Sequence, residues 1–321
     1  FFYAVKNWET FLKGQTSGSG IPHVDKEVLE GIEIFQFPKP EQTKIAEVLS
    51  TVDRAIEQTE SLIAKQQRIK TGLMHDLLTC GIDEHGKLRS EETHQFKDSP
   101  LGRIPLDWEV KKLKDLSCGG ARNGFFKRPE LVGSGYKIIN VSEIYQPFGI
   151  DTNCESVERV DATPSDLLKY GVEKGDLFFT RSSLVLEGIA QCNIIRTINE
   201  PTLFECHVMR IRPDKTKVIP EFLALACQSN LARRFLMSRS KHVTMATISQ
   251  PELEELNVPV PSRLEEQQSI VDTVLASDRV MMSNKVQRRK LQRVKTALMQ
   301  DLLTGKVRVT PLLDSTEVMS E

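Results

Sequence analysis

Hydroxyl and cationic side chains alternate over a short stretch in the second half of the chain. From Ser238 to Thr244 the order is Ser-Arg-Ser-Lys-His-Val-Thr, which suits contacts with phosphate oxygens and base edges. Eight bases and two acids occur from His207 to Met245, whereas eight acids and three bases occur from Val141 to Leu177. This division predicts a domain that presents one face to a polyanion, although a charged run is often only a solvated surface.

A second basic run lies between Lys285 and Lys295, where six bases fall within eleven residues without an acid. It suits a phosphate backbone or an acidic partner protein, and a solvated face explains it equally well. The formal net charge of the chain is -1, so only local patches favour a nucleic acid.

Catalytic motifs are missing from the sequence. There is no G-x-G-x-x-G, P-loop, H-E-x-x-H or G-x-S-x-G, and no N-P-P-aromatic tetrapeptide of the amino-methylating enzymes. The glycine-rich stretch from Gly119 to Gly124 lacks the Lys-Ser/Thr continuation of a phosphate cradle, so we predict a mobile loop there. The residues alone favour a binding and assembly protein.

Cysteine and histidine spacing gives little support to a metal. His75, Cys80 and His85 are five residues apart in turn, but no convincing fourth ligand follows, and we predict no metal site. The six cysteines show no C-x-x-C pair, which favours reduced thiols in a cytoplasm. No apolar run approaches the roughly 18 residues that span a bilayer, so we expect no membrane partner.

An internal repeat organises the chain. Residues 41–79 match residues 266–304 at an offset of 225 with 16 identities in 39 positions and no gap. A proline-ended extended piece precedes each copy, from Glu33 to Pro38 and from Asn257 to Pro261. Each copy therefore predicts a strand, a proline stop and a long helix, which ends near Gly81 or Gly305.

Apolar residues in both helices recur at spacings of three and four, a stripe of coiled-coil type. At 1.5 Å per residue each helix would be about 58 Å long, so we expect two antiparallel rods with a pseudo-two-fold relation. The alternative is that each helix packs on its own domain as ordinary core. The residues predicted for helix pairing and the subunit interface are Ile45, Leu49, Val52, Ile56, Leu73, Leu77, Ile270, Val274, Leu291, Val294, Leu298 and Leu302.

The repeat and the composition predict the domain boundaries. Residues 80–100 are polar and predict a linker, and residues 101–261 alternate short β-rich runs with Gly and Pro before a helical patch from Pro220 to Met237. The remaining segments are 1–40, a remnant of a first domain, the helices 41–79 and 262–304, and a tail, 305–321. Only 40 residues precede the first helix, so we expect the first copy to lack most of its leading domain. The expected fold class is a mixed α/β (α+β) domain plus two long helices.

Four features stand out in the sequence: the Glu-Gln helix starts, the Leu-Met-x-Asp-Leu-Leu-Thr helix ends, the Ser99–Val110 link and the Gly175–Ser182 segment. In these features and their order the chain resembles the specificity (S) subunits of type I restriction-modification enzymes. The resemblance runs from about Gly20 to Leu313. It implies that residues 101–261 are a target recognition domain for half of a bipartite duplex DNA site, and that the two helices are spacers and a docking surface for other subunits.

The resemblance also implies where the chemistry lies. Two modification (M) subunits bind S-adenosylmethionine and methylate adenine, and restriction (R) subunits use ATP and Mg²⁺, so this chain is expected to bind no cofactor and to have no turnover of its own. Pairing of two such chains through the spacer helices could restore a symmetric target. The residues expected to contact DNA are Arg122, Asn123, Arg181, Ser182, Arg239, Lys241, His242 and Thr244.

Two other classes of protein remain as alternatives. One is a free-standing metal-dependent nuclease that uses the acidic cluster, and the other is a coiled-coil adaptor whose α/β domain binds protein. Salt-sensitive preference for one duplex sequence would favour the specificity subunit over the adaptor.

Overall fold

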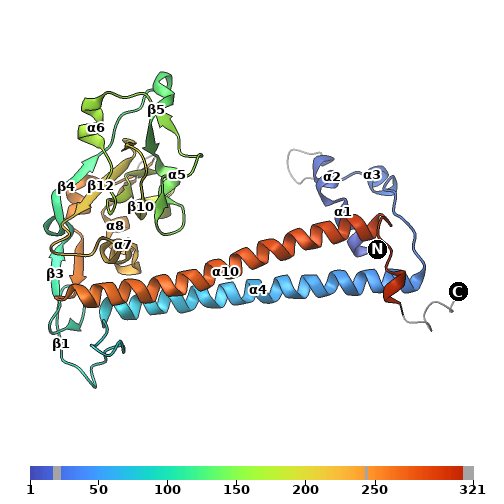
Figure 1. The fold of residues 1–321 in the computed structure, drawn as a ribbon, viewed down its shortest axis with the longest axis horizontal. Helices are drawn as coiled ribbons and strands as arrows, with labels where there is room; N and C mark the ends of the chain where they lie inside the picture. Colours follow the sequence, from blue (N-terminus) through green and yellow to red (C-terminus); the bar gives the residue numbers. More distant parts are fainter. Residues whose placement is uncertain (17–22, 243–244, 314–321) are drawn as a thin grey trace. The chain divides into compact units, whose positions relative to one another are not determined.

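The computed structural model describes residues 1–16, 23–242 and 245–313, and the chain divides into two compact units. Unit 1 comprises residues 1–69 and 277–321, and unit 2 comprises residues 70–276. Two long helices, α4 (Lys39–Thr79) and α10 (Leu264–Leu303), each contribute one end to each unit (Figure 1). They begin within two residues of the predicted starts and end within one residue of the predicted ends.

In unit 1, α4 and α10 run antiparallel. Asn284 Nδ2 donates to Gln66 Oε1 at 2.9 Å, and Arg288 Nη1 lies 3.7 Å from Glu60 Oε1. Lys295 pairs with Asp53 further along. Residue numbers rise along one helix as they fall along the other, as Figure 1 shows. The predicted antiparallel pair is therefore confirmed, with polar bridges in its middle.

Apolar clusters close both ends of the paired helices. The unit 1 cluster joins Ile45 and Leu49 of α4 to Met299 and Leu302 of α10, all buried. In unit 2, Leu77 of α4 and α10 residues such as Ile270 and Val274 join the main hydrophobic core of the domain. Both explanations of the stripe thus hold locally, because the helices pair with each other in unit 1 and also pack on a domain in unit 2.

Each long helix begins with a glutamate that binds an arginine located after the end of the other helix. Glu266, in the first turn of α10, lies 2.9 Å from Arg89 Nη1 and accepts hydrogen bonds from the Trp108 indole and the Ile82 N–H, both at 3.2 Å. Glu41, in the first turn of α4, pairs with Arg308 through two hydrogen bonds, the one from Nε being 2.9 Å long. We call these two contacts the reciprocal ion pairs.

A short motif that the sequence analysis missed supplies both arginines. Gly86-Lys87-Leu88-Arg89 follows α4, and Gly305-Lys306-Val307-Arg308 follows α10. A comparison without gaps misses this match, because six residues lie between the first copy of the repeat and its motif, whereas the second motif directly follows its copy. Gly81 and Gly305, at the helix ends, have φ of +67° and +74°, as expected for helix-stop glycines.

The two reciprocal ion pairs differ in how deeply their arginines are buried. Arg89 is 7% exposed, whereas the Arg308 side chain is 46% exposed. Burial raises the pKa of Glu266 despite the opposing effect of Arg89, whereas the hydrogen bonds from Arg308 lower the pKa of Glu41. When folding raises the pKa of a carboxyl group, the group stabilises the folded state at low pH, and this stabilisation is lost as the pH rises. When folding lowers the pKa, the group stabilises the folded state at neutral pH, and this stabilisation is lost in acid. Lowering the pH therefore weakens the Glu41–Arg308 pair, whereas it removes the cost of burying the ionised Glu266 carboxylate.

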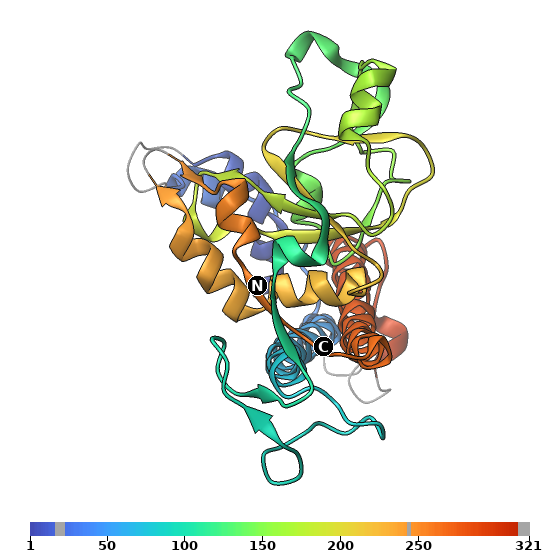
Figure 2. The same ribbon diagram turned by 90° about the vertical axis from the view of Figure 1, so that its left-hand side faces the viewer.

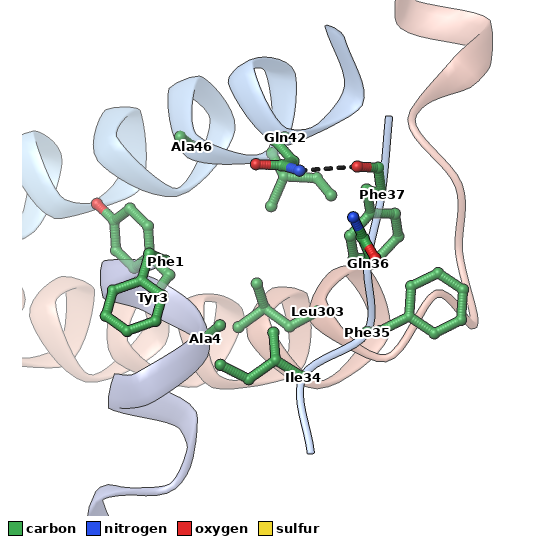
Figure 3. Close-up of a pocket in the computed structure, with 11 residues that line it drawn as sticks. Phe1, Tyr3, Ala4, Ile34, Phe35, Gln36, Phe37, Gln42, Ala46 and Leu303 are labelled. Carbon is green, nitrogen blue, oxygen red and sulfur yellow. Dashed lines mark hydrogen bonds between the residues drawn. The ribbon is translucent and has the colours of Figure 1, made fainter. Parts of the chain in front are cut away.

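Unit 1 also contains three short helices and a segment whose predicted strand is wrong. The helices are α1 (Phe2–Asn7), α2 (Glu9–Gly14) and α3 (Lys26–Glu30), and the tail has the 3-10 turn η4 (Thr310–Leu312). Residues 33–37 are extended but form no strand, because the described residues place no strand beside them. They instead line a cavity of about 340 Å³ with Tyr3 and Leu303, where Gln42 Nε2 donates to the Phe37 carbonyl at 2.7 Å (Figure 3).

The second copy of that segment does form a strand. β15 (Asn257–Val260) pairs antiparallel with β3 (Glu109–Lys112). Gln267, the counterpart of Gln42, donates to the Pro261 carbonyl at 3.0 Å and accepts from the Ile219 N–H at 2.8 Å. The same Glu-Gln helix start thus holds the preceding segment in both copies and, in unit 2, also holds the start of a helix of the domain.

A five-stranded sheet of order β4-β12-β8-β10-β6 forms the centre of unit 2, and a three-stranded sheet of order β11-β5-β7 lies beside it. Phe179 and Met209 face α7 and α8 on one side of the larger sheet, and Phe178 packs with Phe204 on the other, where Figure 2 shows α6. The remaining elements of unit 2 are β1 (Phe96–Lys97), β2 (Ile104–Pro105), η1 (Leu113–Leu116), β4 (Ser117–Asn123), η2 (Pro129–Leu131), β5 (Val132–Ile139), α5 (Val141–Ile144), β6 (Ile150–Asp151), β7 (Arg159–Val160), α6 (Pro164–Tyr170), β8 (Leu177–Thr180), β9 (Ser182–Ser183), η3 (Leu186–Gly188), β10 (Cys192–Thr197), β11 (Thr202–Phe204), β12 (Val208–Pro213), α7 (Pro220–Gln228), α8 (Asn230–Arg239), β13 (Lys241–His242), β14 (Ala246–Thr247) and α9 (Gln250–Glu254).

The mobile loop predicted at Gly119–Gly124 is wrong, because most of it belongs to strand β4. The register between β4 and β12 shifts between Ile211, which pairs with Ala121, and Pro213, which pairs with Ser117, so the extra residues of β4 form a bulge. Gly119 and Gly120 take φ of +83° and +71° there. The positive φ favours glycine at both positions, and a Cβ on Gly120 would also displace the Glu254 carboxylate, 2.4 Å from it.

The reciprocal ion pairs give a first prediction. Arg89→Ala leaves the buried Glu266 carboxylate without its cation and should lower the free energy of unfolding by about 3 to 5 kcal/mol. Arg308→Ala, the comparison variant, removes an arginine that is 46% exposed. Glu41 is itself 4% exposed, but water can take the place of the arginine, so this change should cost less, about 1 to 2 kcal/mol. Urea unfolding of both variants at neutral pH measures the difference, and equal losses would contradict the role assigned to burial.

Candidate nucleic-acid interface

Three two-residue strands bring together side chains that are far apart in the sequence. In the sheet of order β13-β14-β9, Lys241 pairs with Thr247, and Thr247 pairs with Ser182. Directly opposed residues of paired strands point to the same face, so these three side chains form one row. Lys241 and Thr247 are exposed, whereas the next row contains the fully buried Ala246.

His207 extends this row. Its Nδ1 lies 2.8 Å from Ser182 Oγ, and its backbone carbonyl accepts from the Arg181 N–H at 2.8 Å. We call Lys241, Thr247, Ser182 and His207 the polar row. It offers a cation, two hydroxyls and an imidazole on one exposed surface, the donors and acceptors that phosphates and base edges bind.

Arg181 lies beside the polar row, directly after β8. Its side chain is exposed, and Nη1 donates to the Cys206 carbonyl at 3.3 Å. The structure thus brings Arg181, Ser182 and Lys241 together, as the sequence analysis expected of separate loops. It adds His207 and Thr247, which were missed because their closeness arises from strand pairing across more than twenty residues.

Arg122 and Asn123 do not converge on one point. They are the last two residues of β4, and successive side chains of a strand point to opposite faces. Arg122 is exposed and pairs in register with Arg210, whereas Asn123 is half-buried and its Oδ1 is buried without a hydrogen-bond partner. Their expected placement in a loop is therefore wrong, although Arg122 stays available to a ligand.

The basic stretch at the end of α8 is only partly described. The Arg239 guanidinium lies 5.3 Å from the Phe235 ring centroid and is exposed. His242 contributes its backbone to β13, and its side chain lies outside the described residues, as does Thr244. These two candidates remain predictions.

Much of the basic run predicted to face a polyanion is neutralised inside the domain. Arg212 makes two 2.8 Å hydrogen bonds to the buried Asp176 carboxylate and also pairs with Glu173, and Arg210 donates to the Gly171 carbonyl. The hydrogen bonds that Arg212 donates to the Asp176 carboxylate raise the pKa of Arg212 above its ordinary value. Acids and bases that the sequence places in separate blocks thus meet across β8 and β12, so the predicted one-sided charge is wrong for these arginines.

One group in the described part of the chain has metal-ligand chemistry. The ligand atoms of Glu205, Cys206 and His207 lie within 4.8 Å of one another. The Glu205 carboxylate accepts from the His207 N–H at 3.0 Å and from the Cys206 thiol at 3.8 Å, and the His207 ring is held by Ser182. Internal hydrogen bonds therefore account for this cluster.

The predicted helix-pairing residues occupy different environments. Six are buried: Ile45, Leu49, Leu77, Ile270, Val274 and Leu302. Five are half-buried: Val52, Ile56, Leu73, Leu291 and Leu298. Val294 is 48% exposed, so it contributes little to helix pairing within this chain, and its role in a subunit interface stays a prediction.

A family model described as the type I restriction modification DNA specificity domain matches residues 1–66 and 105–293. The chain belongs to this family. It is 32% identical over 318 residues to the type I restriction enzyme MjaVIII specificity subunit of Methanocaldococcus jannaschii, which covers 97% of this chain and 70% of that subunit. Other curated specificity subunits, from the same organism and from Escherichia coli, match over about half of their own length.

Solved structures support the fold. The S subunit of a type I restriction-modification system from M. genitalium has a TM-score of 0.57 and 19% identity, covering 94% of this chain and 71% of that chain. A chain from a study of complex assembly and conformational transition of the type I R-M system has a TM-score of 0.55 and 15% identity, covering 92% and 67%. The predicted fold class, a mixed α/β domain with two long helices, is confirmed.

Family membership decides between the classes considered above. Specificity subunits are the non-catalytic component of type I restriction enzymes, so the prediction of a subunit without its own turnover is confirmed. The comparisons do not favour a free-standing nuclease or an adaptor. Within the described residues, no helix combines the length and apolar character that a membrane crossing needs.

A substitution of Asp176 tests whether the ion pairs of the neutralised arginines stabilise the fold. Asp176→Ala removes a 1% exposed side chain that pairs with Arg212, and it should lower the free energy of unfolding by about 3 to 5 kcal/mol. Glu173→Ala, the control, removes a partner of the same arginine that is 62% exposed and should cost less than about 1 kcal/mol. Denaturant unfolding distinguishes them, and a stable Asp176→Ala variant would contradict the structural role assigned to the Asp176–Arg212 pair.

Proposed function

We propose that this chain recognises a duplex DNA sequence, or one half of a bipartite sequence, within a type I restriction-modification complex. The observation that carries the proposal is the exposed polar row, with Arg181 beside it, in a member of the specificity family. Lys241 and Ser182 suit phosphate oxygens, and Arg181 suits the O6 and N7 acceptors of guanine. Arg122 and Arg239, both exposed, are further candidates.

Part of the proposal concerns the partner subunits. Modification subunits would bind S-adenosylmethionine and methylate adenine, and restriction subunits would use ATP and Mg²⁺, while this chain binds none of these. Its relatives include a specificity subunit of a type I restriction enzyme and a chain from a study of type I R-M complex assembly, which supports an assembly of this kind.

The long helices are the proposed scaffold. Within unit 1 they leave several large apolar side chains in solvent, including Ile69 of α4 and Val280 of α10, each 54% exposed. The others are Leu62, Met282, Val286 and Val294. Apolar side chains exposed on paired helices suit contact with another subunit, and pairing with a second copy of this chain is the other arrangement that such a surface permits.

The direct test uses the chain assembled with a type I modification subunit. The complex is incubated with S-adenosylmethionine and a duplex library of random sequence, and adenine methylation is mapped. Methylation at one defined sequence supports the proposal, and a single or palindromic half site would show how the chain positions its partners. A stable complex with no sequence preference would contradict DNA recognition by this chain and leave a scaffold, and no complex would favour the adaptor.

The polar row predicts two different mutant phenotypes. If Arg181 contacts a base, Arg181→Ala should weaken binding to the preferred duplex by about 1 to 3 kcal/mol and change binding to random DNA little. If Lys241 contacts phosphate, Lys241→Ala should weaken both about equally and reduce the salt dependence by about one ion. Fluorescence anisotropy over a salt series measures both. Loss of affinity with neither variant would remove the polar row from the interface.

A further inference from the structure

The loop that follows β9 presents three consecutive apolar side chains to solvent. Leu184 is 78% exposed, Val185 58% and Leu186 38%. We call residues 184–186 the apolar tip. Single exposed apolar residues are common, but three in a row at the end of a strand require an explanation.

The base of this loop is held by side chains from four other elements or loops. The Glu187 carbonyl accepts from Arg233 Nη2 and from Gln191 Nε2, both at 2.9 Å. The Gly188 carbonyl accepts from Thr180 Oγ1 at 2.6 Å and from the Tyr145 hydroxyl at 3.0 Å. The apolar tip is therefore presented on a rigid support, which lowers the entropy that a contact would cost.

Backbone strain marks the same loop. Ala190 has φ of +49°, the one positive φ of a non-glycine residue among those described. Gly188 has no room for a side chain, since a Cβ there would lie 2.1 Å from Ser183 Oγ. Residues in such conformations persist where the surroundings hold them, and they cluster at ligand-binding sites.

The apolar tip adjoins the proposed interface. Ser183 pairs with Ala246, so Leu184, which follows Ser183, and Met245, which precedes Ala246 and is 37% exposed, leave the two paired strands at the same end. Ser182 of the polar row is two residues before Leu184, and Arg181 is three residues before it. Apolar side chains flanked by Arg181 and Lys241 suit a ligand with a polyanionic backbone and an apolar interior, which describes duplex DNA.

We propose that the apolar tip is a wedge that inserts at a base step of the bound duplex while the polar row holds the adjoining backbone. Leucine and methionine are among the residues that DNA-binding proteins insert between base pairs, which partly unstacks the step and kinks the duplex by about 20 to 90°. The wedge would add specificity for easily unstacked steps such as TA and CA, beyond the hydrogen bonds of the polar row. This inference rests on the proposed function.

The test compares the double variant Leu184→Ser/Val185→Ser with Leu168→Ser. Leu168, on α6 of the same domain, is 91% exposed and serves as the matched control. Both changes are in solvent, so circular dichroism and thermal unfolding should match the parent. Each chain is assembled with a modification subunit, and its affinity is measured for the duplex that the parent complex selects from a random library. The double variant should bind about tenfold or more weakly, and Leu168→Ser should bind as the parent does.

Bending is the second measurement. Energy transfer between dyes at the two ends of that duplex should report a kink with the parent and with Leu168→Ser, and a straighter duplex with the double variant. Replacing thymine by uracil in the duplex should leave the parent's affinity unchanged, because a wedge contacts the stack and not the thymine methyl group.

Three results would overturn the wedge alone: a parent complex that binds without bending, a double variant that bends and binds like the parent, or one that keeps DNA binding but loses the modification subunit. A parent complex that selects no duplex would overturn the proposed function as well.

Discussion

The arrangement of this chain depends on two ion pairs, each between a glutamate at the start of one long helix and an arginine after the other. Each long helix begins with Glu-Gln, and in each the glutamate binds an arginine that follows the other helix. Because the partners are separated by 177 and 267 residues, neither contact can form within one copy of the repeat. The pseudo-two-fold repeat is thus an exchange of arginines between two copies, and it fixes the antiparallel direction of the helices.

The carboxylate of unit 2 also connects the helix to the domain. Glu266 accepts from the Trp108 indole just before β3, and the adjacent Gln267 accepts from the backbone N–H just before α7. The first turn of α10 therefore orients two segments of the domain at once. The sheet that these segments flank in turn carries β8, whose end leads directly to Arg181 and the polar row.

Periodicity and repetition made the two long helices predictable from the sequence. Features that depend on the pairing of distant strands were not predictable. The stripe of apolar residues predicted α4 and α10, and alternation predicted β15. Residues 33–37 have a similar pattern but form no strand, since a strand also needs a neighbour. The glycines at 119 and 120 indicated a loop, whereas they allow a bulge in β4. The closeness of His207 and Thr247 to Ser182 comes from long-range pairing, which no local pattern reveals, and the same holds for the neutralisation of Arg212 by Asp176.

The long separation of the two helices in the sequence also determines when their contacts can form during synthesis. Ile45 and Leu49 share their buried cluster with Phe37, with Met299 and Leu302 of α10, and with Val309, which follows α10. Their partner helix leaves the ribosome 225 residues later, which at about 5 to 20 residues per second is a delay on the order of ten to forty seconds. Throughout that time α4 has an uncovered apolar stripe and an unpaired Glu41. The part of α4 that lies in unit 1 therefore stays open to non-native contacts until residues 299–309 have been made, which is after the core of unit 2, with Leu275 its last residue in the chain, can form.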